Sequence, residues 1–255
     1  MTNVNKTLPA FILLLFMSLL TARADTVLYS SVAGTNLPGN TNNPAYVSLP
    51  SSIKLGDLGL GESLKLSFDV RFSTLDNQTI NSLYSGLSFG FLSSSASVAY
   101  GWVKVNSNNS SFEFLKRSDA NMANYNAGSG ARLSGVESYG TQAIDAIRTN
   151  TLYHYEFSVV HDTATTYSLL FNAWLEDNLL ASYTVTDISS LLSASDITRL
   201  GFRQYDALGL TGGTGITNIV VSQISAIPEP SAAFLLGIGL GTLVLLRRHG
   251  GKKHC

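Results

Sequence analysis

The chain is poor in cysteine, and its single cysteine is the last residue, Cys255. The central part therefore has no disulfide bond, even if the protein is exported to an oxidising compartment, and its stability must come from a packed core. A chain of 255 residues is long enough for one domain of about 200 residues with such a core, plus processing segments at its ends.

Basic charge is also scarce in the central part. Residues 25–227 carry 10 basic and 16 acidic side chains, a net charge of 10 − 16 = −6, whereas every charged side chain in residues 247–255 is basic. A protein that binds nucleic acid neutralises phosphates with a basic surface. The acidic central part therefore argues against nucleic acid as the main partner.

Motifs for metal or nucleophilic catalysis are missing as well. The sequence has no HExxH motif and no EF-hand loop, so we predict no metal and no cofactor, with calcium as an alternative that no motif supports. Residues 86–90 match G-x-S-x-G, but a nucleophile elbow needs a strand followed by a helix. Here Leu87, Phe89 and Phe91 alternate as in a strand, and no helical period follows. We interpret Ser88 as a polar residue of a strand.

The histidines and carboxylates do not form an expected catalytic set. His154 and His161 are seven residues apart, which places them on opposite faces of one strand, so they cannot share a metal ion there. A glycosidase needs two carboxyl groups that flank one sugar bond, and the adjacent Glu176 and Asp177 fall at a predicted turn. We predict that the protein is not an enzyme, with a polysaccharide-acting hydrolase as the alternative.

Alternation of apolar and polar residues dominates the central part and predicts β-strands. The clearest case is SLKLSFDVRF, residues 63–72, and YHYEFSVVHD, residues 153–162, repeats the pattern. Residues 167–175 and 179–185 predict a hairpin around a turn at 176–178. Further strands are predicted at 87–92, 98–105, 111–116, 200–205 and 216–224. The only helical indication follows Asp187, which could cap one or two turns before Leu191 and Leu192.

About ten short strands in about 200 residues, with almost no helix, predict an all-β protein with an antiparallel β-sandwich at residues 25–226. The patterns YHYEFSVVHD, ITRLGFRQYD and ITNIVVSQIS, with the hairpin through LEDN, resemble concanavalin-like and laminin-G-like jelly rolls. The resemblance implies a jelly-roll fold shared by lectins, glycan-binding modules and some glycosidases, and the fold alone does not choose among them. Five aromatic side chains could stack on sugars if they gather at a rim, although core packing is the usual role of aromatics in a sandwich: Trp102, Trp174, Tyr125, Tyr139 and Tyr205.

The first 24 residues have the parts of a secretory signal peptide. Lys6 supplies a positive charge, residues 8–20 are apolar, and Ala22 and Ala24 supply small residues before a cleavage site at Asp25. We expect residues 1–24 to form a signal helix that is removed on export. A membrane anchor is the alternative, but the apolar segment is short for a span.

The C-terminal segment, residues 227–255, combines prolines, an apolar run and basic charge. Pro228 and Pro230 interrupt regular secondary structure between the central part and this segment. Residues 232–246 are apolar and uncharged. A helix of these 15 residues would reach about 22 Å, so it would cross a hydrocarbon core of about 30 Å only with local thinning of the bilayer. We expect a transmembrane helix at 232–246 with its basic tail on the cytoplasmic side.

This order of features resembles the PEP-CTERM sorting signal of Gram-negative bacteria. The resemblance implies that a membrane-embedded exosortase recognises Pro228, Glu229 and Pro230, and that Arg247 and Arg248 stop transfer in the inner membrane. The tail HGGKKHC is longer than the pattern usually has. We therefore expect an exported, non-catalytic protein of the cell surface or extracellular matrix that binds exopolysaccharide. An ordinary C-terminal membrane anchor and a purely structural surface protein without a ligand are the alternatives.

Overall fold

The computed structural model describes the central part of the chain, and its described residues are 25–32, 45–72, 86–105, 110–117, 122, 136–144, 147–148, 151–189, 196–205 and 215–226. Both export signals lie outside these residues, namely the signal peptide 1–24 with Ala22 and Ala24, and the segment 227–255 with Pro228, Glu229, Pro230, Arg247, Arg248 and the expected membrane helix 232–246. No helix within the described ranges is long and apolar enough to cross a membrane.

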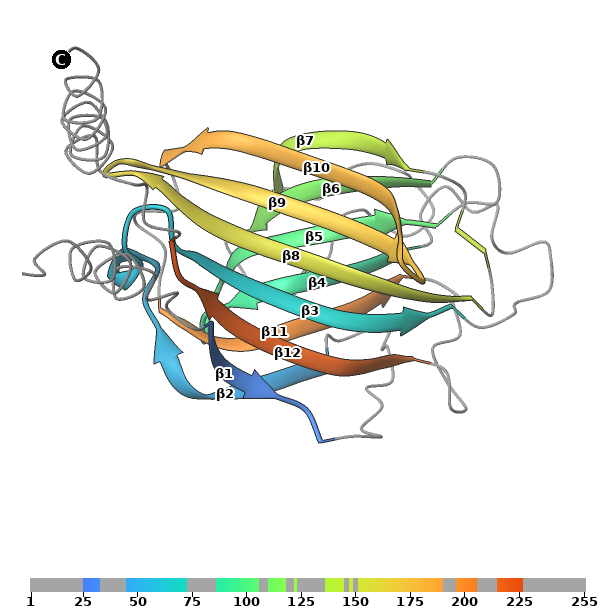
Figure 1. Ribbon diagram of the computed structural model, residues 1–255, viewed down its shortest axis with the longest axis horizontal. Helices are drawn as coiled ribbons and strands as arrows, with labels where there is room; N and C mark the ends of the chain where they lie inside the picture. Colours follow the sequence, from blue (N-terminus) through green and yellow to red (C-terminus); the bar gives the residue numbers. More distant parts are fainter. Residues whose placement is uncertain are drawn as a thin grey trace, which may run out of the picture. The chain divides into compact units, whose positions relative to one another are not determined.

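The described strands form two six-stranded sheets that lie face to face (Figure 1). Sheet A has the spatial order β1 (Thr26–Ser30), β12 (Ile216–Ile224), β3 (Ser63–Arg71), β8 (Leu152–Thr163), β9 (Thr166–Leu175) and β10 (Asn178–Ile188). Sheet B has the order β2 (Ala45–Ile53), β11 (Ile197–Tyr205), β4 (Gly86–Leu92), β5 (Ser97–Lys104), β6 (Ser110–Arg117) and β7 (Val136–Ile144). Every pair of neighbouring strands is antiparallel, which confirms the predicted all-β antiparallel sandwich.

Strand β3 shows how the sequence specifies the two faces of sheet A. Leu64, Leu66 and Phe68 are fully buried, whereas Lys65 and Asp69 point the other way and remain partly exposed. Side chains alternate between the two faces of a strand, so the apolar set faces the core and the polar set faces solvent. The predicted alternation at residues 63–72 is confirmed.

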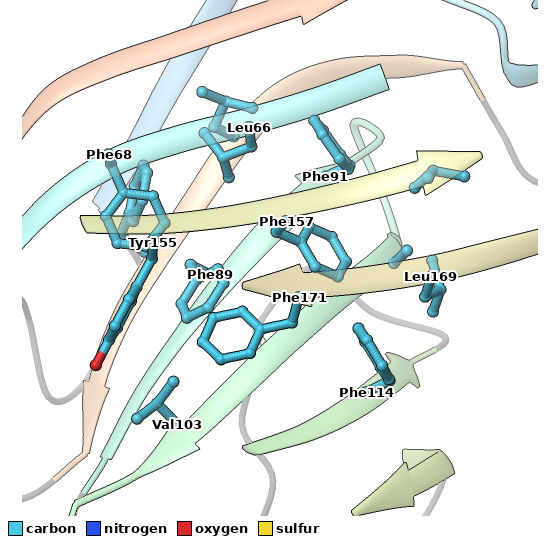
Figure 2. Packing of buried hydrophobic residues seen from close by; sticks show 14 of the residues in the cluster. Leu66, Phe68, Phe89, Phe91, Val103, Phe114, Tyr155, Phe157, Leu169 and Phe171 are labelled. Atoms are coloured by element: carbon cyan, nitrogen blue, oxygen red, sulfur yellow. The ribbon is translucent and has the colours of Figure 1, made fainter. Parts of the chain in front are cut away.

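Aromatic side chains from both sheets fill the space between the layers. Phe171 of β9 stacks on Phe112 of β6, with ring centroids 3.8 Å apart and an interplanar angle of 6°. Phe68 of β3 meets Phe89 of β4 edge-on at 4.8 Å. Figure 2 shows Phe68, Phe89 and Phe171 turned toward one another between the strands. Burial of each such ring stabilises the fold by about 2–3 kcal/mol, so this layer replaces the missing disulfides.

Three strands that the sequence did not predict, β1, β2 and β7, lie at sheet edges. An edge strand is half exposed, so it does not need the regular alternation that marks a central strand. Pro50 lies inside β2, and proline is tolerated there because an edge strand leaves one row of backbone amides unpaired. The alternation of apolar residues therefore identified all the central strands and one edge strand, β10, and passed over the other three edge strands.

The predicted hairpin is present, with one difference in its second strand. Glu176 and Asp177 form the turn between β9 and β10, and the register shifts between Leu179 and Ala181. This irregularity leaves Leu179 exposed, on the face of the strand opposite to Ala181 and Tyr183. Asp187 lies within β10 instead of capping a helix, and residues 190–195, where the helix was expected, lie outside the described residues.

Candidate functional site

A row of five side chains crosses the outward face of sheet A at one level. Consecutive cross-strand pairs join them in register, from β12 through β3, β8 and β9 to β10. The members of this outer row, in order, are Thr217, Asp69, His154, Trp174 and Leu179. Residues directly opposite each other in antiparallel strands lie on the same face, so the five side chains are neighbours. The strands that carry them are labelled in Figure 1.

A connected set of polar side chains surrounds the middle of the outer row. The Nδ1 atom of His154 lies 2.7 Å from Oδ1 of Asp69, and Asn218 donates its Nδ2–H to Oδ2 of Asp69 at 2.6 Å. On the other side of the ring, His154 Nε2 lies 4.0 Å from Oε1 of Glu156. Lys65 donates to the same Glu156 oxygen at 2.8 Å. We call these five residues the polar network.

Interactions within the polar network shift the pKa values of Glu156 and His154. Interaction with His154, together with the Lys65 ion pair, lowers the pKa of Glu156 from 4.5 to about 2, against the opposing effect of partial burial. The interactions with Glu156 and Asp69 raise the pKa of His154 above its usual value of 6.5, again against burial. Glu156 is therefore ionised at neutral pH, and His154 gains a proton more readily than an isolated histidine.

Apolar side chains adjoin the polar network at one end. Trp174 lies beside His154, with ring centroids 5.8 Å apart and the planes tilted by 49°. Leu179, its partner in β10, is 55% exposed, and Leu152, two residues before His154 on the same face of β8, is 45% exposed. Burying a large aliphatic side chain is favourable by about 1.5–3 kcal/mol, so leucines left in water beside a tryptophan mark a surface suited to contact with another molecule.

Unlike the outward face of sheet A, the outward face of sheet B is covered by packed side chains. A second buried cluster covers it and comprises Leu92, Tyr100, Trp102, Leu115 and Met122. Gly201 of β11 lies close below this cover, because a Cβ atom there would come within 2.4 Å of side-chain atoms of Leu92 and Met122 unless these side chains moved. Sheet A therefore presents the open face, with His154 41% exposed in its side chain.

The candidate aromatic residues are divided between these environments. Trp174 lies in the outer row, Trp102 is a buried member of the cluster that covers sheet B, and Tyr139 packs against the core. Tyr205 belongs to β11, with only its backbone described, and Tyr125 lies outside the described residues. The sequence-based expectation of core packing holds for two of them, and Trp174 is the one placed beside polar groups.

Two other residues considered in the sequence, Ser88 and His161, are parts of the packed structure and not of a site. Ser88 lies in β4, as predicted, but is fully buried because the outward face of sheet B is covered. His154 and His161 point to opposite faces of β8, as their spacing predicted. His161 binds the carbonyl oxygen of Leu58 through Nδ1 at 2.7 Å and stacks on Tyr167 with ring centroids 4.7 Å apart, so it has a structural role.

The sequence did not reveal the polar network, because its partners are remote in the chain. Asp69 and His154 are 85 residues apart, and only the pairing of β3 with β8 brings them together. The alternation pattern placed both residues on outward faces, which was the one available signal. The register between the strands was not predictable from either segment alone.

The carboxylates of the polar network are poorly suited to glycoside hydrolysis. That reaction needs one carboxylic acid with a raised pKa that can protonate the leaving group near neutral pH. The pKa of Glu156 is moved in the opposite direction, to about 2. Both oxygens of Asp69 are also engaged by His154 and Asn218. Glu156 therefore lacks the raised pKa that a general acid needs.

Comparison with protein-family models and with curated protein sequences finds no match. Solved structures with a similar arrangement include the CBM2 module of the evolved Dit protein of Lactobacillus casei BL23 phage J-1. It has a TM-score of 0.41 and 9% identity, over 82% of this chain and 93% of that one. Peanut lectin has a TM-score of 0.38 and 10% identity, over 81% and 92% of the two chains.

An endo-1,3-beta-glucanase from Streptomyces sioyaensis has a TM-score of 0.35 and 9% identity, over 72% of this chain and 74% of that one. At these TM-scores and identities the likenesses are too distant to assign an activity or a ligand to this chain. The function must be argued from the described residues themselves.

Proposed function

We propose that the protein is an exported, non-catalytic surface or matrix protein that binds polysaccharide through the outward face of sheet A. The single observation that supports this most is the position of Trp174 beside the polar network. Polysaccharides offer hydroxyl groups that donate and accept hydrogen bonds, and pyranose rings with apolar faces. A tryptophan next to ordered carboxylate, imidazole and amide groups matches both features.

The polar network is pre-organised for such a ligand. His154 and Asn218 already hold Asp69, and Lys65 already holds Glu156, so these side chains lose little further freedom on binding. A ligand that finds its partners in place avoids the entropy of ordering them, which amounts to about 0.5–1.5 kcal/mol for each flexible side chain. The partly exposed atoms of His154 and Glu156 remain accessible to hydroxyl groups.

Replacement of Trp174 by alanine tests the binding site. We expect W174A to lose about tenfold or more of its affinity for a bound polysaccharide, since the apolar contact to the sugar ring disappears. The measurement is affinity electrophoresis of the full chain in mild detergent through gels that contain a panel of polysaccharides. Y46A is the matched control, because Tyr46 is a partly exposed aromatic residue on sheet B that stacks on Arg199 at 4.2 Å.

The result that contradicts this site is equal retardation of W174A and the unmodified protein by the same polysaccharide. Retardation by none of the polysaccharides would favour the ligand-free structural alternative. Circular dichroism of W174A should match the unmodified protein, because Trp174 lies on the outward face and not in the core.

Delivery to the surface is the second part of the proposal, and it rests on the two terminal segments. We expect R247E/R248E to disturb membrane retention and processing, because acidic residues replace the charges that hold the tail on the cytoplasmic side. The mass and location of the mature protein, measured by cell fractionation and mass spectrometry, check this. An unchanged mass and location in the variant would contradict exosortase-dependent sorting.

A further inference from the structure

We infer that a hydroxyl group of the ligand binds between His154 and Glu156, and that this contact requires His154 to be protonated. The inference rests on the proposed function and adds the chemical group that the polar network recognises and the protonation state that binds it. It is carried by two geometric observations, namely the contact of Asp69 with one ring nitrogen of His154 and the distance from the other nitrogen to Glu156.

Asp69 determines which nitrogen of the His154 ring carries a proton. Oδ1 of Asp69 lies 2.7 Å from Nδ1 of His154, and Oδ2 accepts a hydrogen bond from Asn218. An ionised carboxylate only accepts hydrogen bonds, so Nδ1 is the donor of this pair. The other nitrogen, Nε2, is therefore an acceptor in the neutral ring and a donor in the protonated ring.

Nε2 of His154 and the carboxylate of Glu156 are placed to share a third group. Nε2 lies 4.0 Å from Oε1 of Glu156, which is beyond the usual N–H···O distance of about 2.7–3.2 Å. Both side chains are partly exposed, so an oxygen atom of a ligand can approach each of these atoms to about 2.8 Å. Oε1 accepts from Lys65 at 2.8 Å and keeps a second lone pair for such a group.

The protonation state of His154 decides whether a hydroxyl group satisfies both partners. With a protonated ring, the hydroxyl oxygen accepts from Nε2–H and the hydroxyl hydrogen is donated to Glu156. With a neutral ring, Nε2 and Glu156 are both acceptors, and a hydroxyl group has one hydrogen for the two of them. A water molecule has two hydrogens, so a hydroxyl group that displaces it from two acceptors loses a hydrogen bond. The loss of one hydrogen bond to a charged group lowers affinity by about tenfold or more.

Among the described residues on the outward face of sheet A, His154 is the one side chain of a type that titrates near neutral pH. The described charged side chains on or beside this face near His154 come from β3, from β8 and from the β9–β10 turn, and β12 adds an amide: Lys65, Asp69, Arg71, Glu156, Glu176, Asp177 and Asn218. Carboxylic acids ordinarily titrate near about pH 4, and lysine and arginine above about pH 10. The charges around His154 therefore stay constant while its own charge changes.

The sign of the pH dependence follows from this protonation step. The hydrogen bonds with Glu156 and Asp69 raise the pKa of His154 above its usual value of 6.5, against the effect of partial burial. The pKa of Glu156 is about 2, so this carboxylate remains an acceptor at every pH at which His154 titrates. The affinity for a hydroxyl ligand should therefore be highest below the pKa of His154 and should fall as the pH rises through it.

The test is calorimetric titration of the full chain in mild detergent at about pH 5.5, pH 7 and pH 8.5. The probes are neutral glucan, galactan and mannan hexasaccharides, which offer hydroxyl groups but have no group that titrates in this range. We expect the dissociation constant of the hexasaccharide that binds best to increase about tenfold or more from the lowest to the highest pH. An affinity that is independent of pH, or one that increases with pH, would overturn the inference.

Two variants locate the pH dependence. A glutamine amide can donate a hydrogen bond throughout this range, so the affinity of H154Q should change by less than about twofold between the lowest and the highest pH. H161N is the matched control, because His161 lies on the opposite face of β8 and an asparagine amide can replace its Nδ1 contact with the carbonyl oxygen of Leu58. H161N should keep the pH dependence of the unmodified protein. A pH dependence that is lost in H161N and kept in H154Q would contradict the assignment.

Imidazole NMR of the unmodified protein gives a measurement that does not depend on the folding of a variant. Because binding and protonation are linked, saturation with the hexasaccharide should raise the pKa of His154. An unchanged or lowered pKa of His154 in the complex would also overturn the inference, while the proposed function would stand. If none of the hexasaccharides binds at any of the three pH values, the proposed binding site fails and the inference fails with it.

Discussion

The stacked pair formed by Phe112 and Phe171 gives the sharpest prediction about the fold. The two rings come from different sheets, lie 3.8 Å apart at an angle of 6°, and are fully buried. Phe171 also meets the ring of Tyr155 at 5.3 Å. Replacing Phe171 by alanine removes a whole ring from a close-packed layer, and such a change costs about 3–5 kcal/mol.

The expected loss should be visible in thermal unfolding. In a domain of about 200 residues each 1 kcal/mol lowers Tm by about 2–4 °C, so F171A should lower Tm by about 10 °C. The assay is circular dichroism of the full chain in mild detergent. V27A is the control, because Val27 is 60% exposed on β1 and its loss should cost less than about 0.5 kcal/mol.

A double-mutant cycle isolates the contact between the sheets. F112A alone should also be strongly destabilising, but the double variant F112A/F171A should lose about 1 kcal/mol less than the two single changes together. That coupling arises because each single change already removes the stacked pair. Additive effects, or a loss of under about 1 kcal/mol for F171A, would refute the face-to-face packing of the sheets.

Three further predictions concern single contacts. The pKa of Glu156 is about 2 and its side chain is 22% exposed, so after solvent screening E156Q should lower the free energy of unfolding by about 1–2 kcal/mol at neutral pH. Urea titrations should show that this difference between variant and unmodified protein vanishes as the pH falls from about 4.5 to about 2. Below that range Glu156 is protonated in both the folded and the unfolded state. G140A should lower the free energy of unfolding by about 2 kcal/mol or more in the same assay, because Gly140 has φ 146° and a Cβ atom there would collide with Oη of Tyr183. The double variant G140A/Y183F should recover part of this lost stability, because it lacks the colliding hydroxyl group. Y167F should cost about 1 kcal/mol, measured by thermal unfolding, because it removes the hydrogen bond to the buried carbonyl of Leu55.

The central strands of the fold were predictable because burial imposes a pattern on them. Residues 63–72 alternate strictly, since one face of β3 meets the core and the other meets water. Strand β7 carries no such pattern, because it closes one edge of sheet B and is only partly buried. The turn at Glu176 and Asp177 was predictable from local chemistry, but the bulge that exposes Leu179 was not.

The candidate site was predictable only in its parts. Trp174 was one of five aromatic candidates, and the sequence had no means of separating it from Trp102, which is buried in the second apolar cluster. His154 seemed an isolated histidine until the pairing of β3 with β8 brought Asp69 to its Nδ1 atom. The site depends on long-range register, and register depends on the packing of the whole sheet.

The two tryptophans of the chain lie on the outward faces of different sheets, which gives a direct test of the binding surface. In W102F the only tryptophan is Trp174, and in W174F it is the buried Trp102. Titration of both full-length variants with a neutral oligosaccharide, followed by tryptophan fluorescence, measures which face meets the sugar. The account predicts a saturable change in W102F and none in W174F. A change in W174F alone, or binding that leaves the fluorescence of Trp174 unaltered, would contradict it.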